Sequence, residues 1–97
     1  MLYLNEPAPA VNSLHINSQR TVVVFCNDCK LPVTSSAKVI RSTDPAIADQ
    51  YGLLRSDGLV GPGYAVITST GVVRYRTFDP APGQHSGEID RLVRTLP

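Results

Sequence analysis

The sequence lacks the features that mark several classes of protein. It has no cluster of basic residues, and its nine Lys and Arg against eight Asp and Glu give a formal net charge of only +1. We therefore expect no nucleic-acid partner and no binding to an acidic membrane surface. No apolar run approaches the length of a membrane span, and the first residues do not resemble a secretory leader, so we expect no membrane span and a cytoplasmic location.

Tryptophan is absent and cysteine is scarce, with two residues in a chain of 97. In a cytoplasmic protein, a pair of cysteines is more often redox-active or metal-binding than a static structural bridge. The hydrophobic content of 42% is that of a compact globular protein, and no internal repeat or low-complexity segment is visible. We expect a single domain over residues 1–97.

Both cysteines follow one apolar segment directly. Thr21–Phe25 is too short for a self-standing helix and does not alternate with polar residues, which predicts a buried strand inside a parallel or mixed sheet. It leads straight into Cys26-Asn27-Asp28-Cys29. A Cys-x-x-Cys after a buried strand indicates redox chemistry, because a helix that begins there would favour the thiolate form of the sulfurs.

The rest of the pattern predicts an α/β fold in which a central mixed sheet of four or five strands is flanked by helices. A strand hairpin and a helix end the chain. In the first half of the chain we expect an extended entry over 5–11, an edge strand over 11–16, the buried strand and a short helix over 30–37. A strand over 38–41 and a helix capped by Asp44 and ended by Gly52 follow. After a loop over 53–63 we expect strands over 64–67 and 72–76 and a final helix capped by Ser86.

Four segments in this order resemble the thioredoxin superfamily, and within it the peroxiredoxin-like (alkyl hydroperoxide reductase/thiol-specific antioxidant) branch. Glu6–Val11 is similar to the opening motif of that branch, Val22–Cys29 to its strand and cysteine, and Asp44–Leu53 to its following helix. Pro62–Ile67, with Gly71 nine residues after the proline, resembles its Pro-Thr-x-Phe-x-Ile-Asp-x-x-Gly signature. The resemblance covers nearly the whole chain and implies a thioredoxin-like fold with a cis proline beside the cysteines.

The chain also departs from that family. The tryptophan before the first cysteine is absent, the helix after the cysteines has room for only half the family length, and Cys26 follows Phe25 without a spacer. Cys29 therefore falls closer than Cys26 to the usual position of the nucleophile. The Pro-x-x-x-Thr/Ser-x-x-Cys pattern of peroxidatic sites is missing, so we expect no peroxidase activity of the usual kind.

The function predicted from these features is that of a small thiol-disulfide oxidoreductase without a cofactor. Cys26 would attack a partner disulfide and Cys29 would resolve the mixed disulfide, with the reverse order left open. Asp28 and Lys30 would tune the thiol pKa; the Asp28 carboxylate should raise it and make the pair reducing.

The resemblance implies that Gly61, Pro62 and Gly63 border a substrate groove, which the two glycines would widen. The substrate would be a protein disulfide or a small thiol, and a second copy or a larger partner would cover the face left by the shortened helix.

Two other functions fit the same residues. One is a thioredoxin-fold interaction module whose cysteines no longer turn over. The other is half of a metal site, because two thiolates fill only half of a tetrahedral site; His15, His85 or a second chain, with which the site would be shared, would have to complete the coordination. For both histidines an ordinary surface position is the simpler interpretation.

Overall fold

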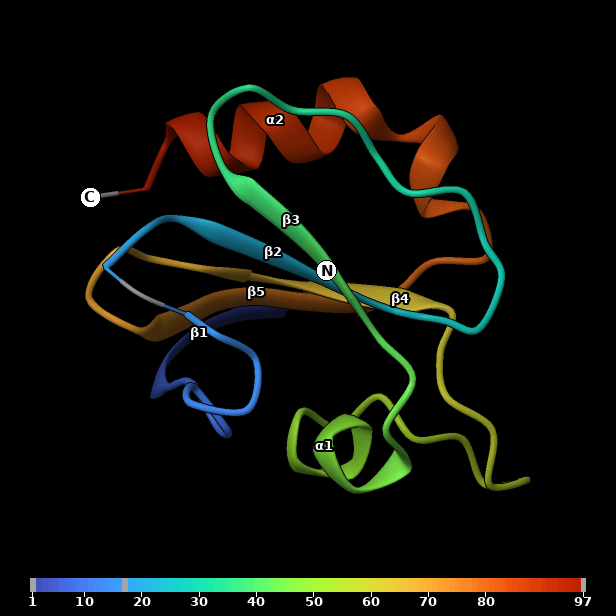
Figure 1. The fold of residues 1–97 in the computed structure, drawn as a ribbon. Coiled ribbons are helices and arrows are strands. Elements are labelled where there is room, and N and C mark those ends of the chain that lie inside the picture. The colour runs from blue at the N-terminus through green and yellow to red at the C-terminus, as the bar shows by residue number, and fades with distance from the viewer. Residues whose placement is uncertain (1, 17, 97) are drawn as a thin grey trace.

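The structure is a computed structural model that describes residues 2–16 and 18–96. Its five-stranded mixed sheet has the order β1-β5-β4-β2-β3 (Figure 1). The strands are β1 (Leu2–Pro7), β2 (Thr21–Phe25), β3 (Lys38–Ser42), β4 (Gly63–Ile67) and β5 (Val72–Phe78). Only β2 and β3 are parallel, and every other neighbouring pair is antiparallel. The expected α/β class and small mixed sheet are confirmed.

The strand that precedes the cysteines is an interior strand of this sheet. β2 pairs with β3 on one side and with β4 on the other, and all five of its residues are buried. A strand covered on both faces needs apolar side chains pointing both ways, which explains the lack of alternation in its sequence. The end of β2 is therefore held firmly from both sides.

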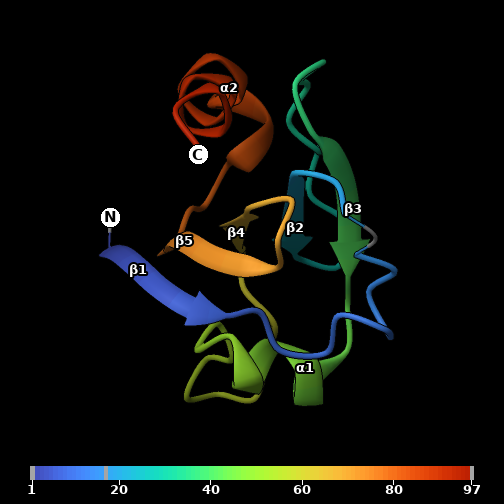
Figure 2. The same ribbon diagram turned by 90° about the vertical axis from the view of Figure 1, so that its left-hand side faces the viewer.

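One helix covers each face of the sheet (Figures 1 and 2). Helix α1 (Pro45–Gln50) lies on one face and α2 (Ser86–Arg94) on the other, with a 3-10 turn, η1 (Pro82–Gln84), before α2. Side chains of β2 alternate between two hydrophobic clusters. The cluster on the α1 side includes Val23, Phe25, Ala48, Tyr51, Leu53, Ala65 and Ile67. The cluster on the α2 side includes Val22, Val24, Cys26, Tyr64, Val66, Ile89 and Val93.

The expected helix after residue 43 is confirmed together with its cap. Asp44 Oδ1 accepts a hydrogen bond from the Ala46 N–H at 2.9 Å, and Pro45 occupies the first turn, where its missing N–H costs nothing. The phenol of Tyr51, just past the helix, donates to the Pro9 carbonyl at 2.8 Å. This bond ties the segment after β1 to the α1 side of the core.

The expected helix over residues 30–37, a shortened counterpart of the family's active-site helix, is absent. Residues 26–37 connect β2 to β3 without any helical turn. Pro32 disfavours a helical Leu31, and the following Thr-Ser-Ser sequence is a weak helix former. Leu31 and Ala37 still pack against the α2-side cluster, so the segment itself covers part of the sheet that a helix would cover.

The expected edge strand over 11–16 is also wrong. Residues 9–15 form consecutive turns, with Ala10 and His15 at positive φ, while β1 takes the edge position beside β5. Leu14 and Ile16 are buried in the α1-side cluster. These apolar side chains are therefore buried in the core beneath the sheet, whereas the local sequence pattern predicted a strand at its edge.

Ser86 does not cap α2 as expected. The cap position belongs to His85, whose side chain makes no capping bond, and Ser86 Oγ donates instead to the Gly83 carbonyl at 3.3 Å. Ser86 Oγ also accepts a hydrogen bond from the Val33 N–H at 2.9 Å, which attaches the 26–37 segment to the start of α2. Within the described parts of the chain, neither helix is long and apolar enough to span a bilayer.

Candidate functional site

The two cysteines form a disulfide at the carboxyl end of β2. Cys26 is the first residue after the strand, and the Cα atoms of Cys26 and Cys29 lie 5.9 Å apart. The strand fixes the position of Cys26, while Asn27 and Asp28 form an exposed bend that returns the chain to Cys29. The Cys-x-x-Cys pattern thus closes a small ring next to a fully buried strand.

The two sulfurs have different surroundings. Cys26 is only 2% exposed and belongs to the α2-side cluster, whereas Cys29 packs at the border of that cluster and is partly exposed. An incoming thiol or thiolate therefore has its access at Cys29. The residues alone did not distinguish the two cysteines in this way.

No helix begins at the cysteines, so no helix dipole favours a thiolate there. A different positive charge is present. Arg41, on the edge strand β3, donates from Nη2 to the carbonyl oxygen of Cys29. Asp28 and Lys30, which the sequence suggested as tuning residues, both flank Cys29 with exposed side chains.

The Gly61–Pro62 peptide bond is cis, as expected. The β2–β4 ladder ends at the pair Phe25 and Gly63, so Cys26 and Pro62 are the residues that adjoin this last pair along the chain. Gly61, at φ +55°, lies so close that an added Cβ would overlap the Phe25 carbonyl oxygen. The loop before β4 therefore lies against the start of the cysteine motif.

The three residues expected to border a groove do not all do so. A shallow cavity of about 510 Å³ is lined by Gly61 and Pro62 together with Leu54, Arg55, Ser56, Phe78, Asp79 and Pro80. Gly63 is buried in β4, where an added Cβ would collide with the Thr77 carbonyl oxygen. The missing side chains of Gly61 and Gly63 thus allow close backbone packing and do not widen the groove.

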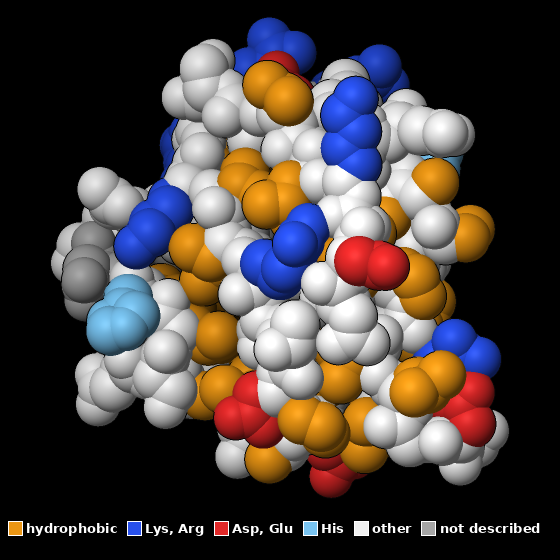
Figure 3. All heavy atoms as spheres, turned by 45° about the vertical axis from the view of Figure 1, so that its right-hand side comes forward, with side chains coloured by type: hydrophobic (Ala, Val, Ile, Leu, Met, Phe, Trp, Pro, Cys, Tyr) orange, Lys and Arg blue, Asp and Glu red, His pale blue; other side chains and the backbone are white. Residues whose placement is uncertain are grey.

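The side of the molecule turned toward the viewer in Figure 3 has hydrophobic side chains that reach the surface in many small groups, interspersed with charged ones. Among the described residues, Val33, Leu59 and Phe78 are the large hydrophobic side chains that are more than half exposed. Phe78 lines the cavity beside Pro62.

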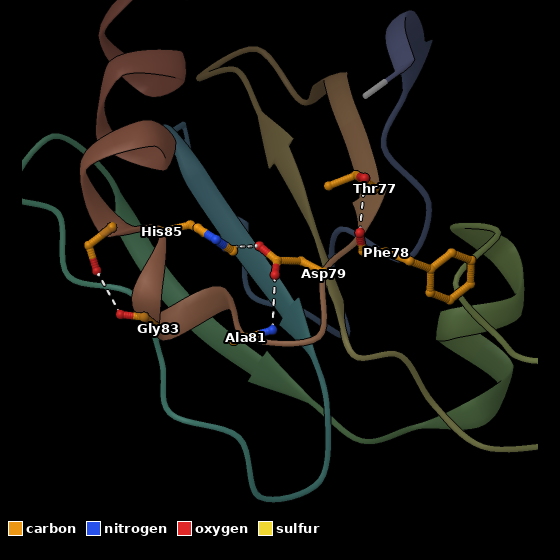
Figure 4. Close-up of polar contacts among 7 residues, drawn as sticks. Thr77, Phe78, Asp79, Ala81, Gly83 and His85 are labelled. Atoms are coloured by element: carbon orange, nitrogen blue, oxygen red, sulfur yellow. Dashed lines mark hydrogen bonds and ion pairs between the residues drawn. The ribbon is translucent and has the colours of Figure 1, made fainter.

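An Asp–His pair that sequence reasoning missed lies at the end of β5. His85 Nδ1 is 2.7 Å from Asp79 Oδ2, and Asp79 Oδ1 accepts from the Ala81 N–H (Figure 4). The Asp79 N–H donates to the Pro62 carbonyl. The Phe78 ring points away from this pair, toward α1 (Figure 4). Burial, with the nearby carboxylates of Glu88 and Asp79, raises the pKa of Tyr64 to about 12.

These unpredicted residues differ in the signal that could have revealed them. The position of Arg41 near the cysteines could have been predicted from a general rule. The carboxyl ends of adjacent parallel strands meet at one edge of a sheet, and both Cys26 and Arg41 stand near such an end. The Asp79–His85 contact depends on the path of the chain through η1, and no local pattern predicts it.

The histidines do not join the cysteines in a metal site. His15 lies exposed in a turn near the opposite end of the parallel strands, where its carbonyl accepts from Lys38 Nζ. The imidazole of His85 contacts the Asp79 carboxylate. Over residues 2–16 and 18–96, no group of three or more His, Cys, Asp or Glu side chains is arranged to hold a metal ion.

Comparison of the chain with protein-family models, with curated proteins and with solved structures finds no match.

Proposed function

We propose that this protein is a small thiol-disulfide oxidoreductase in which Cys26 and Cys29 alternate between a disulfide and two thiols. The observation that carries the proposal is the disulfide at the end of an interior strand, with one sulfur buried and the other partly exposed. A purely structural bridge gains little from spanning only three positions, because disulfide stabilisation grows with loop length.

The exchange transfers two electrons and needs no cofactor. One cysteine thiolate attacks a sulfur of the partner disulfide, which forms a mixed disulfide and releases the partner's other sulfur as a thiolate that takes up a proton. The second cysteine then loses its proton and attacks the first, which closes the Cys26–Cys29 bond and frees the partner's remaining thiol. A dithiol or two monothiols regenerate the reduced pair.

Two features support a thioredoxin-type arrangement. The strand order around β2 is compatible with a thioredoxin-like fold, and a cis proline precedes β4, with Gly61 before it packed against the Phe25 carbonyl that precedes Cys26. The cavity beside Pro62 gives an extended peptide a place to lie against Pro62 and Phe78. On this view the substrate is a disulfide in a protein segment that can adopt an extended form.

Turnover of a model disulfide tests the proposal. The wild-type protein should catalyse reduction of a dithionitrobenzoate or insulin disulfide by dithiothreitol, and the Cys26→Ser/Cys29→Ser variant should show only the uncatalysed rate. Wild-type protein without catalysis would overturn the proposal. If a protein partner then still bound the double variant, the interaction module would explain the fold.

Equilibration with glutathione measures the reduction potential of the Cys26–Cys29 pair. We expect a reducing potential, because burial of Cys26 in the α2-side cluster disfavours its thiolate and the Asp28 carboxylate opposes a second negative charge nearby. A pair that stays fully reduced in oxidised glutathione would contradict this expectation, and so would a potential near that of strong periplasmic oxidants.

Peroxide reduction should be slow. The hydroxyl side chain of the peroxidatic pattern is absent: Val23 stands at its offset from Cys26, and Cys26 itself at its offset from Cys29. Stopped-flow measurement with hydrogen peroxide should show the rate of an ordinary thiol. A rate like that of a peroxidase would contradict this expectation.

A further inference from the structure

We propose that Arg41 stabilises the Cys29 thiolate and that Cys29, not Cys26, is the sulfur that exchanges with the partner disulfide. This inference rests on the proposed function and assigns the order of attack within it. Arg41 takes the role that a helix N-terminus cannot play here, because residues 26–37 form no helix.

The parallel pairing of β2 and β3 brings Arg41 to the cysteines. Val24 pairs with Arg41, so the guanidinium is anchored two residues before Cys26, on the strand that forms the edge of the sheet. Its Nη2 donates to the Cys29 carbonyl oxygen. Because that oxygen and Sγ belong to one residue, the guanidinium lies within roughly 7 Å of Cys29 Sγ.

The charges around Cys29 favour its ionised form. Its own segment supplies the Asp28 carboxylate and the Lys30 ammonium, and β3 supplies the Arg41 guanidinium. Toward α2, Lys30 lies against Gly83. The ionisable groups on that side include the paired Asp79 and His85, the phenol of Tyr64 in the same cluster as the cysteines, and the Glu88 carboxylate that acts on Tyr64. One carboxylate and two cations thus belong to Cys29 and its nearest neighbours, and Arg41 tips the balance toward a negative sulfur.

Accessibility selects the same sulfur. Cys26 is 2% exposed and packed in the α2-side cluster, so a partner disulfide cannot line up with its sulfur without displacing core side chains. Cys29 is partly exposed. Attack on a disulfide requires the nucleophile, the attacked sulfur and the leaving sulfur to lie nearly in line, which demands open space around the attacking atom.

The exchange then runs in a defined order. The Cys29 thiolate attacks one sulfur of the partner disulfide, forms the intermolecular S–S bond and expels the partner's other sulfur, which takes up a proton. Cys26 loses its proton and attacks Cys29 Sγ, and the partner leaves as a dithiol. In the reverse direction, a reducing thiolate attacks Cys29 Sγ and expels Cys26.

Single-cysteine variants test the order of attack. With a dithionitrobenzoate or peptide disulfide as substrate, Cys26→Ser should accumulate a mixed disulfide through Cys29, whereas Cys29→Ser should trap little, as read by intact mass. Trapping by Cys29→Ser alone would overturn the assignment and leave the proposed function standing. Failure of both variants to trap, together with inactive wild type, would instead remove the proposed function.

The role of Arg41 is tested on the thiol itself, in the Cys26→Ser background. Arg41→Gln should raise the Cys29 pKa by about half to one unit, as expected when a cation some 7 Å away in a largely aqueous setting is lost. Iodoacetamide alkylation at pH 7 should slow about two- to fourfold, because the smaller thiolate fraction is partly offset by higher nucleophilicity. Arg41→Lys, which keeps the charge, should retain most of the wild-type rate.

Two controls separate a charge effect from a structural one. Arg91→Gln removes the same charge from an exposed position on α2 and should leave alkylation unchanged. Raising the salt to about 0.5 M should shrink the difference in alkylation rate between the Arg41→Gln variant and its parent, because screening weakens a charge effect but not a steric one. An Arg41→Gln variant with an unchanged Cys29 pKa would overturn the role of Arg41.

Discussion

At the scale of single residues, the two cysteines differ because one continues the alternation of a strand and the other does not. Val22, Val24 and Cys26 point to the same face, so Cys26 enters the α2-side core with them. Cys29 follows an exposed bend and stays at the border of that core. The chemistry of the pair is therefore asymmetric even though the sequence motif is symmetric.

Replacement of Gly61 by alanine should lower the free energy of unfolding by more than the same change at Gly58. Both glycines have positive φ, +55° and +82°, but only at Gly61 would the new Cβ overlap the Phe25 carbonyl. We expect a loss of more than about 2 kcal/mol for Gly61→Ala and of about 1 kcal/mol for Gly58→Ala, where space is open. Urea denaturation measures both losses. Equal losses would mean that the loop before β4 does not lie against Phe25 at the end of β2.

Thr34→Val should lower stability at neutral pH and not in strong acid. The hydrogen bond from Thr34 Oγ1 to Asp90 Oδ1, at 2.5 Å, holds the pKa of Asp90 below its usual value, with help from Arg94. The stability due to this lowered pKa is fully present above the unfolded value of about 3.9 and is lost as the pH falls through the folded value. The difference between wild type and variant should therefore shrink toward pH 2.

Urea unfolding at a series of pH values measures that difference. Ser35→Ala, at the exposed neighbouring position, is the matched control and should change little at any pH. A difference between wild type and Thr34→Val that stays constant across the series would show that Asp90 is not coupled to Thr34.

At the scale of elements, the unusual feature is a parallel crossover without a helix. Such a crossover usually contains one, and a connection of this length without secondary structure is uncommon in a compact domain. Here the segment over 26–37 is held from outside, by the Val33 N–H on Ser86, by Thr34 on Asp90 and by Lys30 against Gly83. Figure 1 shows it running past the start of α2 before it enters β3.

Alanine substitution at two glycines near the start of α2 tests this attachment. Gly83→Ala should cost about 1–2 kcal/mol, because its Cβ would come within 2.7 Å of the Lys30 carbonyl oxygen. Gly87→Ala, inside α2 and facing open space, should instead stabilise the protein by about 0.5 kcal/mol. Chemical denaturation measures both. A neutral Gly83→Ala would show that the 26–37 segment does not rest on η1.

At the scale of the whole molecule, stability comes mainly from the two clusters on either side of the sheet and to a smaller extent from the disulfide. None of the four strand pairings involves a cysteine, and the ring closed by the bridge is small. We therefore expect the fold to persist when the disulfide is reduced, which the proposed redox cycle requires.

Reduction with dithiothreitol should lower the free energy of unfolding by no more than about 2 kcal/mol, the chain-entropy value for a loop this short. The circular dichroism spectrum and the dispersion of amide NMR signals should stay native. Alkylation of the reduced thiols after unfolding serves as the check that reduction was complete. Cooperative loss of native signals on reduction would contradict this account.

The sequence by itself determined the features that depend on local chemistry. The apolar run predicts the buried β2, Asp44 with Pro45 predicts the start of α1, and the spacing of Ile89 and Val93 predicts the buried side of α2. Each is decided within a few residues, by burial on both faces, by capping or by periodicity.

Only the tertiary structure decided the features that depend on partners distant in the chain. The 26–37 segment makes contacts with η1 and α2 in place of helical hydrogen bonds. Leu14 and Ile16 are buried in the core and do not form an edge strand. Arg41 reaches Cys29 because two strands run in parallel. Local propensity is worth a fraction of a kcal/mol per residue, so burial and long-range contacts outweigh it wherever the two conflict.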